Sequence, residues 1–278
     1  MRKYTALLLL ATLSLASCGD DDPVVVVEPL NKLTKISCYE EDNNSLLYSA
    51  SGSYNVDGSI ASIDFTGDTR RSFIYSDNKI LMTKTQTGFK EAEYTLSGGR
   101  ISRQENYKEN DLVSNEIYVS DAYDYQYTGS DLSAIGWTTR WPKENGQGYE
   151  ERVYPLSDIF TWENGNVVRY TRDKEEMTYT YGSLVNPENF TLRPIASFDL
   201  LSFDFVSPLN LLFGTTNRNL PERAYSYSVT EPSQYKSEYV FTYTFVSDYI
   251  LEMKVVKQDE SGTRNTYLYK FEYDYKVN

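Results

Sequence analysis

Carboxylates are the most abundant side chains in this sequence that could act as general acids or bases. The chain has 40 aspartate and glutamate residues and no histidine. Two carboxyl groups about 5 to 10 Å apart across a sugar would suit glycoside hydrolysis. Nothing in their spacing distinguishes the adjacent pairs Glu150-Glu151 and Glu175-Glu176 from solvated surface charge, the usual state of acidic side chains.

The lack of histidine excludes several kinds of catalytic site. Serine–histidine and cysteine–histidine nucleophile systems and histidine-bearing zinc sites all need it. The sequence also has no phosphate-binding glycine-rich loop, nucleophile elbow or calcium loop, and the run at residues 20–22 lacks the ligand spacing of a calcium loop. We therefore expect a protein that is not an enzyme and has no catalytic residue, metal or cofactor. A carboxylate-based glycan hydrolase is the least favoured alternative.

Residues 137–149, WTTRWPKENGQGY, are the best candidates for ligand recognition, and their composition indicates a loop. Tryptophan faces can stack on sugar rings, and arginine or asparagine can hydrogen-bond hydroxyl groups. The alternative is that both tryptophans pack at the rim of the fold. The candidate residues for binding a glycan or small molecule are Trp137, Arg140, Trp141 and Tyr149.

The N-terminal residues predict a secretory signal peptide over residues 1–17. A short basic start is followed by an apolar run at residues 6–15, which is too short to span a bilayer. The run ends Leu15-Ala16-Ser17-Cys18, which resembles the lipobox of bacterial lipoproteins. That resemblance implies cleavage before Cys18 and acylation of its thiol. The alternative is an ordinary thiol behind an ordinary cleavage site.

Residues 19–23, GDDDP, resemble the export signal that Bacteroides-type lipoproteins use to reach the outside of the outer membrane. The alternative is a solvated linker. We expect a lipidated acidic tether over residues 18–30 and one domain over residues 31–278. The predicted location is the outer membrane, exposed at the cell surface, with the periplasmic face as the alternative.

Net charge and cysteine count limit the partners and cross-links of this chain. A net charge of −13 repels nucleic acid, so no nucleic-acid partner is expected. Contact with the membrane would come through the lipid on Cys18. The chain has two cysteines, and we expect the second, Cys38, to be buried like a small hydrophobic residue.

A repeated pattern predicts β-hairpins. In Phe73-Ile74-Tyr75-Ser76-Asp77-Asn78-Lys79-Ile80, alternating aromatic residues run into turn residues, and an aliphatic residue follows five positions after the second aromatic. Such repeated hairpins predict an antiparallel meander that must curl into a barrel-like sheet to hide its apolar face. The other copies are Leu96 to Ile101, Tyr127 to Leu132, Trp162 to Val167, Phe245 to Ile250 and, one residue longer, Tyr54 to Ile60.

The segment TYLYKFEYDYKV, residues 266–277, shows the same alternation at greater length. Its rings would form the inner wall of the barrel, with charges on the opposite face. Those charges would each cost a few kcal/mol in a bilayer, so we expect the barrel to be soluble. The rings are Tyr267, Tyr269, Phe271, Tyr273 and Tyr275, and the charges are Lys270, Glu272, Asp274 and Lys276.

Residues 186–221 depart from the strand pattern, because they hold four of the nine prolines. Ser207-Pro208 followed by LNLLFG reads as an N-cap, a first-turn proline, an apolar turn and a glycine stop. We expect one short helix that covers one end of the barrel and buries Leu209, Leu212 and Phe213.

Taken together, the lipobox with its acidic tether, the hairpins, the motif at residues 217–221 and the closing tyrosine-rich strands resemble a family of Bacteroides-type lipoproteins. That family is a domain of unknown function with a porin-like fold, and the resemblance covers residues 31–278. It implies a barrel in the cell envelope and transfers no catalytic residue. The leading hypothesis is a lipid-anchored, non-enzymatic binding or accessory protein of unknown ligand, and the alternative is a surface glycan-binding protein that uses its tryptophans.

Overall fold

The computed structural model describes residues 32–68, 70–113, 116–145, 147–187 and 212–274. The predictions for the signal peptide, Cys18, the acidic tether and Tyr275 lie outside the described residues, as does the first part of the predicted helix, residues 207–211.

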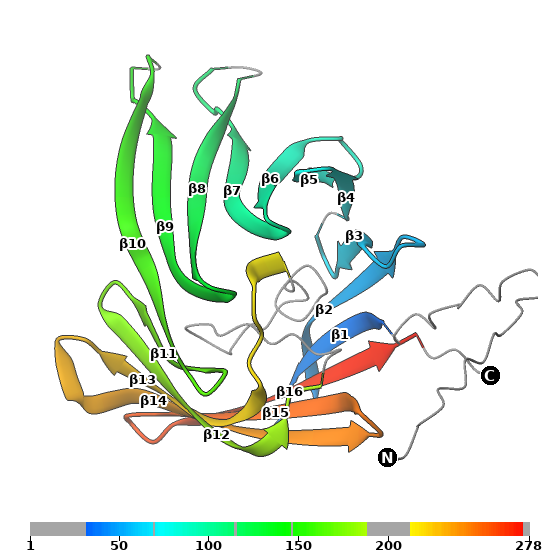
Figure 1. Ribbon diagram of the computed structural model, residues 1–278, viewed down its shortest axis with the longest axis vertical. Coiled ribbons are helices and arrows are strands. Elements are labelled where there is room, and N and C mark those ends of the chain that lie inside the picture. The colour runs from blue at the N-terminus through cyan, green and yellow to red at the C-terminus, as the bar shows by residue number, and fades with distance from the viewer. Residues whose placement is uncertain (1–31, 69, 114–115, 146, 188–211, 275–278) are drawn as a thin grey trace, which may run out of the picture.

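Within the described residues, sixteen antiparallel strands form a closed barrel, which confirms the predicted all-β fold (Figure 1). Each strand pairs with its neighbours in sequence, and β1 pairs with β16 to close the circle. The strands are β1 Leu33–Glu40, β2 Ser45–Tyr54, β3 Ile60–Phe65, β4 Arg71–Ser76, β5 Lys79–Lys84, β6 Lys90–Ser97, β7 Arg100–Glu109, β8 Ile117–Thr128, β9 Asp131–Pro142, β10 Tyr149–Glu163, β11 Asn166–Arg172, β12 Glu175–Val185, β13 Asn219–Ser228, β14 Glu231–Val246, β15 Tyr249–Asp259 and β16 Arg264–Tyr273.

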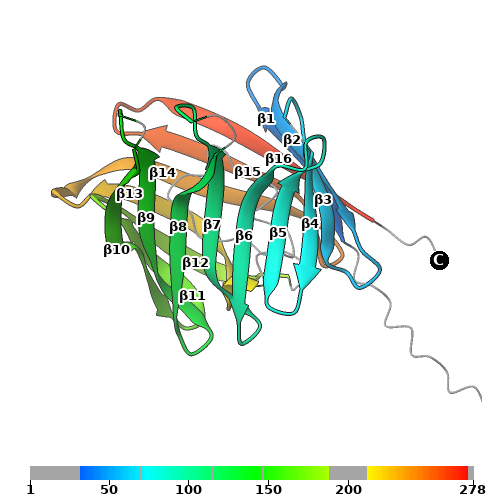
Figure 2. The ribbon, with the colours of Figure 1, turned by 90° about the horizontal axis from the view of Figure 1, so that it is seen from above.

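All six predicted hairpins are present, and their turns lie at one end of the barrel, here called the turn end (Figure 2). The other end, with the β3–β4, β5–β6, β7–β8 and β9–β10 connections, is the loop end. At the β10–β11 turn, Asn164 and Gly165 take the positive φ angles of 51° and 80° that a tight hairpin needs. The aromatic and aliphatic residues of each pattern face each other directly: Tyr54 and Ile60, Tyr75 and Ile80, Leu96 and Ile101, Tyr127 and Leu132, Trp162 and Val167, and Phe245 and Ile250.

Aromatic side chains also link neighbouring hairpins through hydrogen bonds to backbone carbonyls. Tyr127 Oη donates to the Ile101 carbonyl at 2.6 Å, and Trp162 Nε1 donates to the Leu132 carbonyl at 2.8 Å. Each ring therefore buries apolar surface and satisfies a carbonyl oxygen inside the barrel. The same kind of bond joins Tyr54 to Leu33, Tyr181 to Val167, Tyr243 to Pro221 and Tyr273 to Ile250.

The aromatic ladder of β16 points into the barrel, as predicted. Tyr269 is 0% exposed, Phe271 3% and Tyr273 6%. Between them, Glu272 is exposed and pairs with Lys35 of β1, with Nζ and Oε1 2.8 Å apart. The rings therefore build the core, and the alternate positions of the strand carry the polar surface.

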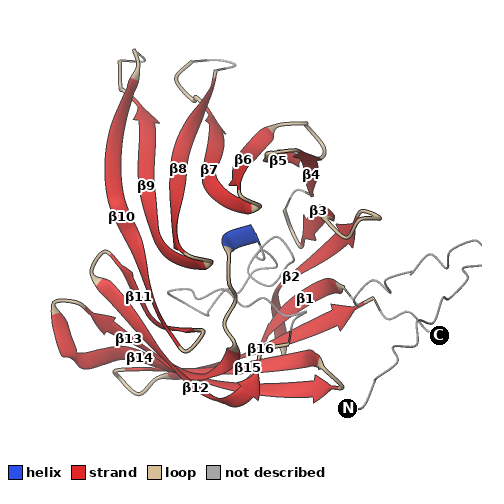
Figure 3. Ribbon diagram, viewed as in Figure 1, coloured by secondary structure: helices blue, strands red, loops and turns tan. Residues whose placement is uncertain are grey.

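Residues 212–219, here called the closing segment, cover the turn end at hairpins β8–β9 and β10–β11. Leu212 and Phe213 form one short helical turn, drawn blue in Figure 3, which is the described part of the predicted helix. The Phe213 ring lies 5.0 Å from the Tyr125 ring inside the barrel. Thr215 N donates to the Ser130 carbonyl at 2.9 Å. The predicted covering of one barrel end is thus observed for these residues.

Asparagines anchor this closing segment to β11. The Val167 N–H donates to Asn217 Oδ1 at 2.8 Å, and the Asn219 N–H donates to Asn166 Oδ1 at 2.8 Å. Asn166 and Asn217 are both buried. Because their amides satisfy backbone groups of the neighbouring segment, the closing segment is held against β11.

Among the described residues, no helix has the length and apolar composition needed to cross a bilayer.

Buried tyrosines predict how stability depends on pH. Burial raises the pKa of Tyr75 to about 12, and it also raises the pKa values of Tyr54, Tyr181 and Tyr243. A phenol whose pKa is raised in the folded state adds stability that is fully present below its pKa in the unfolded chain, about 10. This stability is lost as the pH rises through the pKa of the folded state. Since the chain has no histidine, we expect the free energy of unfolding to change little between about pH 6 and 9 and to fall above about pH 10.

Denaturant titrations across this pH range, read together with tyrosinate absorbance, would check the expectation. Tyrosinate from the buried tyrosines should appear together with loss of the native signal. Ionisation of all tyrosines near their ordinary pKa in a protein that stays folded would contradict it.

Candidate ligand-binding site

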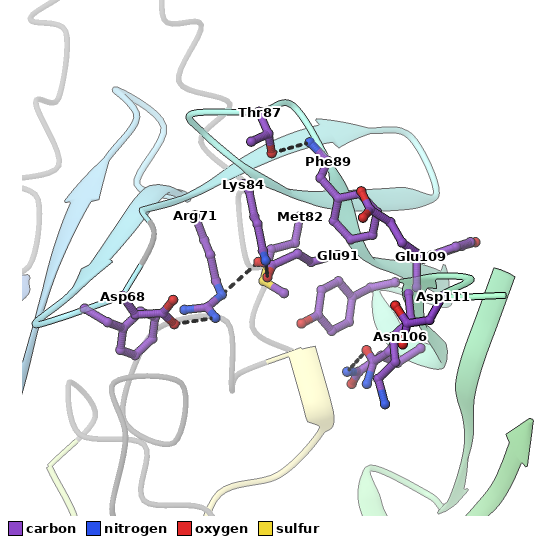
Figure 4. Close-up of a pocket in the computed structure, with 15 residues that line it drawn as sticks. Asp68, Arg71, Met82, Lys84, Thr87, Phe89, Glu91, Asn106, Glu109 and Asp111 are labelled. Atoms are coloured by element: carbon purple, nitrogen blue, oxygen red, sulfur yellow. Dashed lines mark hydrogen bonds and ion pairs between the residues drawn. The ribbon is translucent and has the colours of Figure 1, made fainter. Parts of the chain in front are cut away.

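A cavity of about 920 Å³ opens at the loop end, on the inner side of strands β3 to β7 (Figure 4). Its volume falls within the range of about 300 to 1,000 Å³ typical of small-molecule sites. It lies at the end of the barrel opposite residues 212–219. The lining residues are Phe65, Asp68, Arg71, Met82, Lys84, Thr87, Phe89, Glu91, Tyr94, Gln104, Asn106, Tyr107, Lys108, Glu109 and Asp111.

One wall of the cavity is a cluster of ion pairs centred on Arg71. Its Nη2 lies 2.8 Å from Asp68 Oδ2, and its Nε lies 2.9 Å from Glu91 Oε2. Lys84 Nζ lies 3.6 Å from the second oxygen of Glu91. The Arg71 guanidinium also lies over the Phe65 ring, 4.7 Å from its centroid. The Arg71 group is thereby held by two carboxylates and a ring, and its charge is balanced locally.

The facing wall carries two side-chain amides on β7. Gln104 Nε2 donates to Asn106 Oδ1 at 2.9 Å, and Tyr125 Oη donates to Gln104 Oε1 at 2.9 Å. This chain of bonds orients both amides. Among the described residues, Asn106 Nδ2 has no hydrogen-bond acceptor within the protein. Figure 4 shows Asn106 and Arg71 on opposite sides of the cavity.

Aromatic rings supply the apolar part of the lining. Phe65 and Phe89 are half-buried, and Tyr94 is 6% exposed. The Lys84 ammonium group lies over one of these rings, with Nζ 5.7 Å from the Phe89 centroid. The Tyr107 ring lies instead on the outer face of β7, where its hydroxyl donates to Glu105 Oε2 at 3.0 Å and Lys90 Nζ lies 4.0 Å from its centroid.

The cavity therefore combines flat apolar rings, fixed amides and paired charges, which suits binding of a polar molecule with apolar faces. In the described part of the chain, no three acidic or cysteine side chains are arranged to hold a metal ion.

The segment predicted to be a recognition loop is mostly strand. Residues 137–142 belong to β9 and Tyr149 opens β10, so the connecting loop is only residues 143–148. The loop expectation was wrong because Pro142 is tolerated as the last residue of its strand, where a missing N–H costs no pairing in the middle of the sheet.

Trp137 is packed between two tyrosines on the inner face of the barrel. Its ring lies 5.0 Å from that of Tyr154, with an interplanar angle of 12°, and 6.5 Å from that of Tyr123, with an angle of 7°. Its Nε1 donates to Asp121 Oδ1 at 3.1 Å. Rings therefore lie on both sides of the indole, which braces strands β8, β9 and β10.

The other predicted residues lie apart from Trp137 and from each other. Trp141 is 40% exposed, and its Nε1 donates to Glu150 Oε2 at 3.1 Å. Arg140 pairs with Glu151, and strand alternation places it on the opposite face from Trp141. Tyr149 stacks on Tyr118 at 4.9 Å and donates to Glu116 Oε1 at 2.7 Å. The four residues do not converge on one site.

The cavity residues were not found from the sequence. They come from five strands and three connections, and only their register in the closed sheet brings them together. One local signal existed, since Gln104, Asn106 and Lys108 place polar groups at alternate positions of β7. That alternation indicates a polar inner face of β7, but it does not show that Arg71 lies on the opposite wall.

Solved structures include one with a similar fold. A porin-like protein from Bacteroides vulgatus ATCC 8482 superposes with a TM-score of 0.55 at 14% sequence identity, covering 87% of this chain and 98% of that chain. A second structure, titled TcdB2-TccC3-Cdc42, gives a TM-score of only 0.15 at 10% identity and covers 85% of this chain and 16% of that chain. At such low identity, the first likeness shows the fold alone.

No curated protein matches the chain. Residues 18–278 match the family described as Domain of unknown function (DUF5032), and the chain belongs to that family.

Proposed function

We propose that this protein is a lipid-anchored component of the bacterial cell envelope that binds a ligand in its loop-end cavity and does not transform it. The observation that carries the proposal is the cavity of about 920 Å³, lined by rings, amides and ion pairs. Among the described residues that line it there is neither serine nor cysteine, and the chain has no histidine to activate a nucleophile.

The anchor is supported by the sequence before the barrel. A lipobox ends at Cys18, an acidic tether follows it, and the family match starts at the same residue. Two or three acyl chains on one cysteine give a stable membrane anchor. The porin-like relative comes from a Bacteroides species, which favours an outer-membrane lipoprotein at the cell surface. The periplasmic face is the alternative.

The outer surface of the barrel supports a position outside the bilayer. Ion pairs lie on the outer faces of its strands, such as Lys35 with Glu272, and Arg103 with Asp124 at 2.7 Å. Each such charge on a lipid-facing position would cost a few kcal/mol at the bilayer midplane. The barrel wall is therefore suited to water, with the lipid supplying the membrane contact.

The proposed anchor and the cavity would lie at opposite ends of the barrel. Strand β1 starts with Leu33 at the turn end, where the Leu33 carbonyl accepts the Tyr54 hydroxyl. A tether from Cys18 would thus join the barrel at the turn end. The cavity opens at the opposite end, away from the membrane and toward molecules in solution.

Replacing the acylated cysteine should abolish membrane attachment. We expect the Cys18→Ser protein to move almost entirely from the membrane fraction to the soluble fraction, because no other membrane device is proposed. Mass spectrometry of the parent should show the acyl mass on Cys18. A Cys38→Ser variant, in which the second cysteine is changed, should remain membrane-bound. Equal membrane attachment of the Cys18→Ser protein would contradict the anchor.

Filling the cavity should abolish ligand binding. We expect at least one compound in a panel of envelope oligosaccharides, peptides and amphiphiles to raise the melting temperature of the parent. Asn106→Trp should lose that shift because the indole would occupy the cavity. Gln126→Trp, on the exposed outer face of β8, should keep it. Equal responses of both variants, or no response of the parent, would contradict the proposal.

Exposed Trp141 favours a second candidate, which is glycan stacking outside the cavity. Its ring is 40% exposed, whereas Trp137 has rings on both sides. Trp141→Ala would abolish this mode of binding and leave binding in the cavity unchanged.

A further inference from the structure

We infer that the loop-end cavity selects an uncharged, hydroxyl-rich ligand of the carbohydrate class, present as a short oligomer. The inference rests on the proposed function, because it specifies which ligand the cavity takes.

The charges within the cavity are already paired. Arg71 contacts Asp68 at 2.8 Å and Glu91 at 2.9 Å, and Lys84 lies 3.6 Å from Glu91. The Glu91 side chain is only 16% exposed, so these pairs lie in a partly desolvated wall. A charged ligand would have to compete with partners that are fixed in place. The wall therefore offers polar atoms without a net charge to attract an ion.

The remaining lining charges lie toward solvent and have mixed signs. The Lys108 side chain is 66% exposed, and its Nζ lies 4.0 Å from Asp121 Oδ2. Glu109 and Asp111 are exposed as well. Solvated charges of opposite sign within one mouth are screened and partly cancel each other. The mouth therefore gives no strong preference for an anion or a cation.

The fixed polar groups match hydroxyls. A hydroxyl group can donate one hydrogen bond and accept others, so a ligand with several hydroxyls can bind the Asn106 amide through one of them and an ion-paired carboxylate oxygen through another. Tyr125 donates to Gln104, and Gln104 donates to Asn106, so this chain of bonds holds the Asn106 amide in place. A rigid donor of this kind lowers the ordering cost of binding. A peptide has fewer hydroxyl groups than a sugar, so it would bind fewer of the polar groups on the two walls.

The rings and the size of the cavity complete the argument. Half-buried Phe65 and Phe89 offer apolar surface to the C–H face of a sugar. A volume of about 920 Å³ lies near the upper end of the small-molecule range, which leaves room for more than one sugar ring.

Calorimetric titration of the mature protein tests the inference. The probes are neutral manno-, cello- and malto-oligosaccharides, acidic oligogalacturonate and cationic chitosan oligomers, each at low and high salt. We expect at least one neutral probe to bind, with a Kd that changes less than about twofold with salt, because no ionic contact is screened. The charged probes should bind at least about tenfold more weakly.

Variants then place the bound probe. Asn106→Ala removes a fixed donor and should weaken binding of the neutral probe by about five- to tenfold. Asn106→Asp keeps the side-chain shape, replaces the donor by an acceptor and should weaken binding as much, which separates lost recognition from lost folding. Gln126→Ala on the outer face should leave the Kd unchanged.

Two results would overturn the inference and leave the proposed function standing. One is tightest binding of a charged probe, with strong salt dependence and sensitivity to Asn106→Ala. The other is a melting-temperature shift of the parent by peptides or amphiphiles alone, lost in Asn106→Trp. If no compound of any class binds the parent, both the inference and the proposed function fail.

Discussion

Replacing Tyr269 with alanine is expected to lower the free energy of unfolding by about 3 to 5 kcal/mol, the usual cost of removing a fully buried aromatic side chain. Tyr269 is 0% exposed and lies directly opposite Cys38 of β1, at the seam where the first and last strands close the barrel. Its loss would leave a cavity, because the surrounding structure relaxes only partly. Denaturant unfolding of parent and variant measures the difference.

Lys270→Ala is the matched control, because Lys270 is the next residue on the same strand. Its side chain faces outward, with Nζ 5.1 Å from the Tyr39 ring centroid, and its removal should cost less than about 1 kcal/mol. Similar losses for both variants would show that the ladder does not alternate between core and surface, and the assigned fold would then be wrong.

Gly214→Ala is expected to lower the free energy of unfolding by about 3 kcal/mol, since it combines backbone strain with a steric clash. Gly214 has a φ of 93°, and a Cβ there would lie 2.4 Å from the Ser130 carbonyl oxygen and 3.1 Å from Tyr127 Cε1. The alanine would push residues 212–219 away from the β8–β9 turn and open the turn end.

Gly262→Ala separates these two contributions. Gly262 has a similar φ of 84°, but a Cβ there would meet nothing within 4 Å. Only strain should remain, at about 1 kcal/mol. An equal loss for Gly262→Ala and Gly214→Ala in thermal or denaturant unfolding would show that the close contact of the closing segment contributes nothing.

The fold could be predicted because its determinants are local. In the segment from Phe73 to Ile80, alternation selects the face of each residue and Asp77-Asn78 marks the turn, so neither step needs distant information. The same reasoning placed the rings of β16 inside. Closure followed from the need to cover an apolar face, and pairing of β1 with β16 confirmed it.

The candidate site could not be predicted because its determinants are distant. Arg71 and Asn106 are 35 positions apart in sequence and meet only through the registers of β4 to β7. Trp137 and Trp141 were singled out for their residue type, which indicates large contact area but not whether a ligand or a neighbouring strand covers it. The Trp137 ring is covered by the neighbouring rings of Tyr123 and Tyr154.

The most direct test of the account is thiol labelling of the folded mature protein with a cysteine placed at residue 106. In a Cys18→Ser background the other native thiol is Cys38, which is 0% exposed and whose pKa burial raises to about 11, so it stays protonated at neutral pH. For Asn106→Cys we predict fast reaction with a small neutral maleimide and slow reaction with a polymer-linked one, while Gln126→Cys reacts quickly with both. Reaction of Asn106→Cys with neither reagent would mean a filled core, and equal reaction with both would mean a flat surface; either result would contradict a ligand cavity at the loop end.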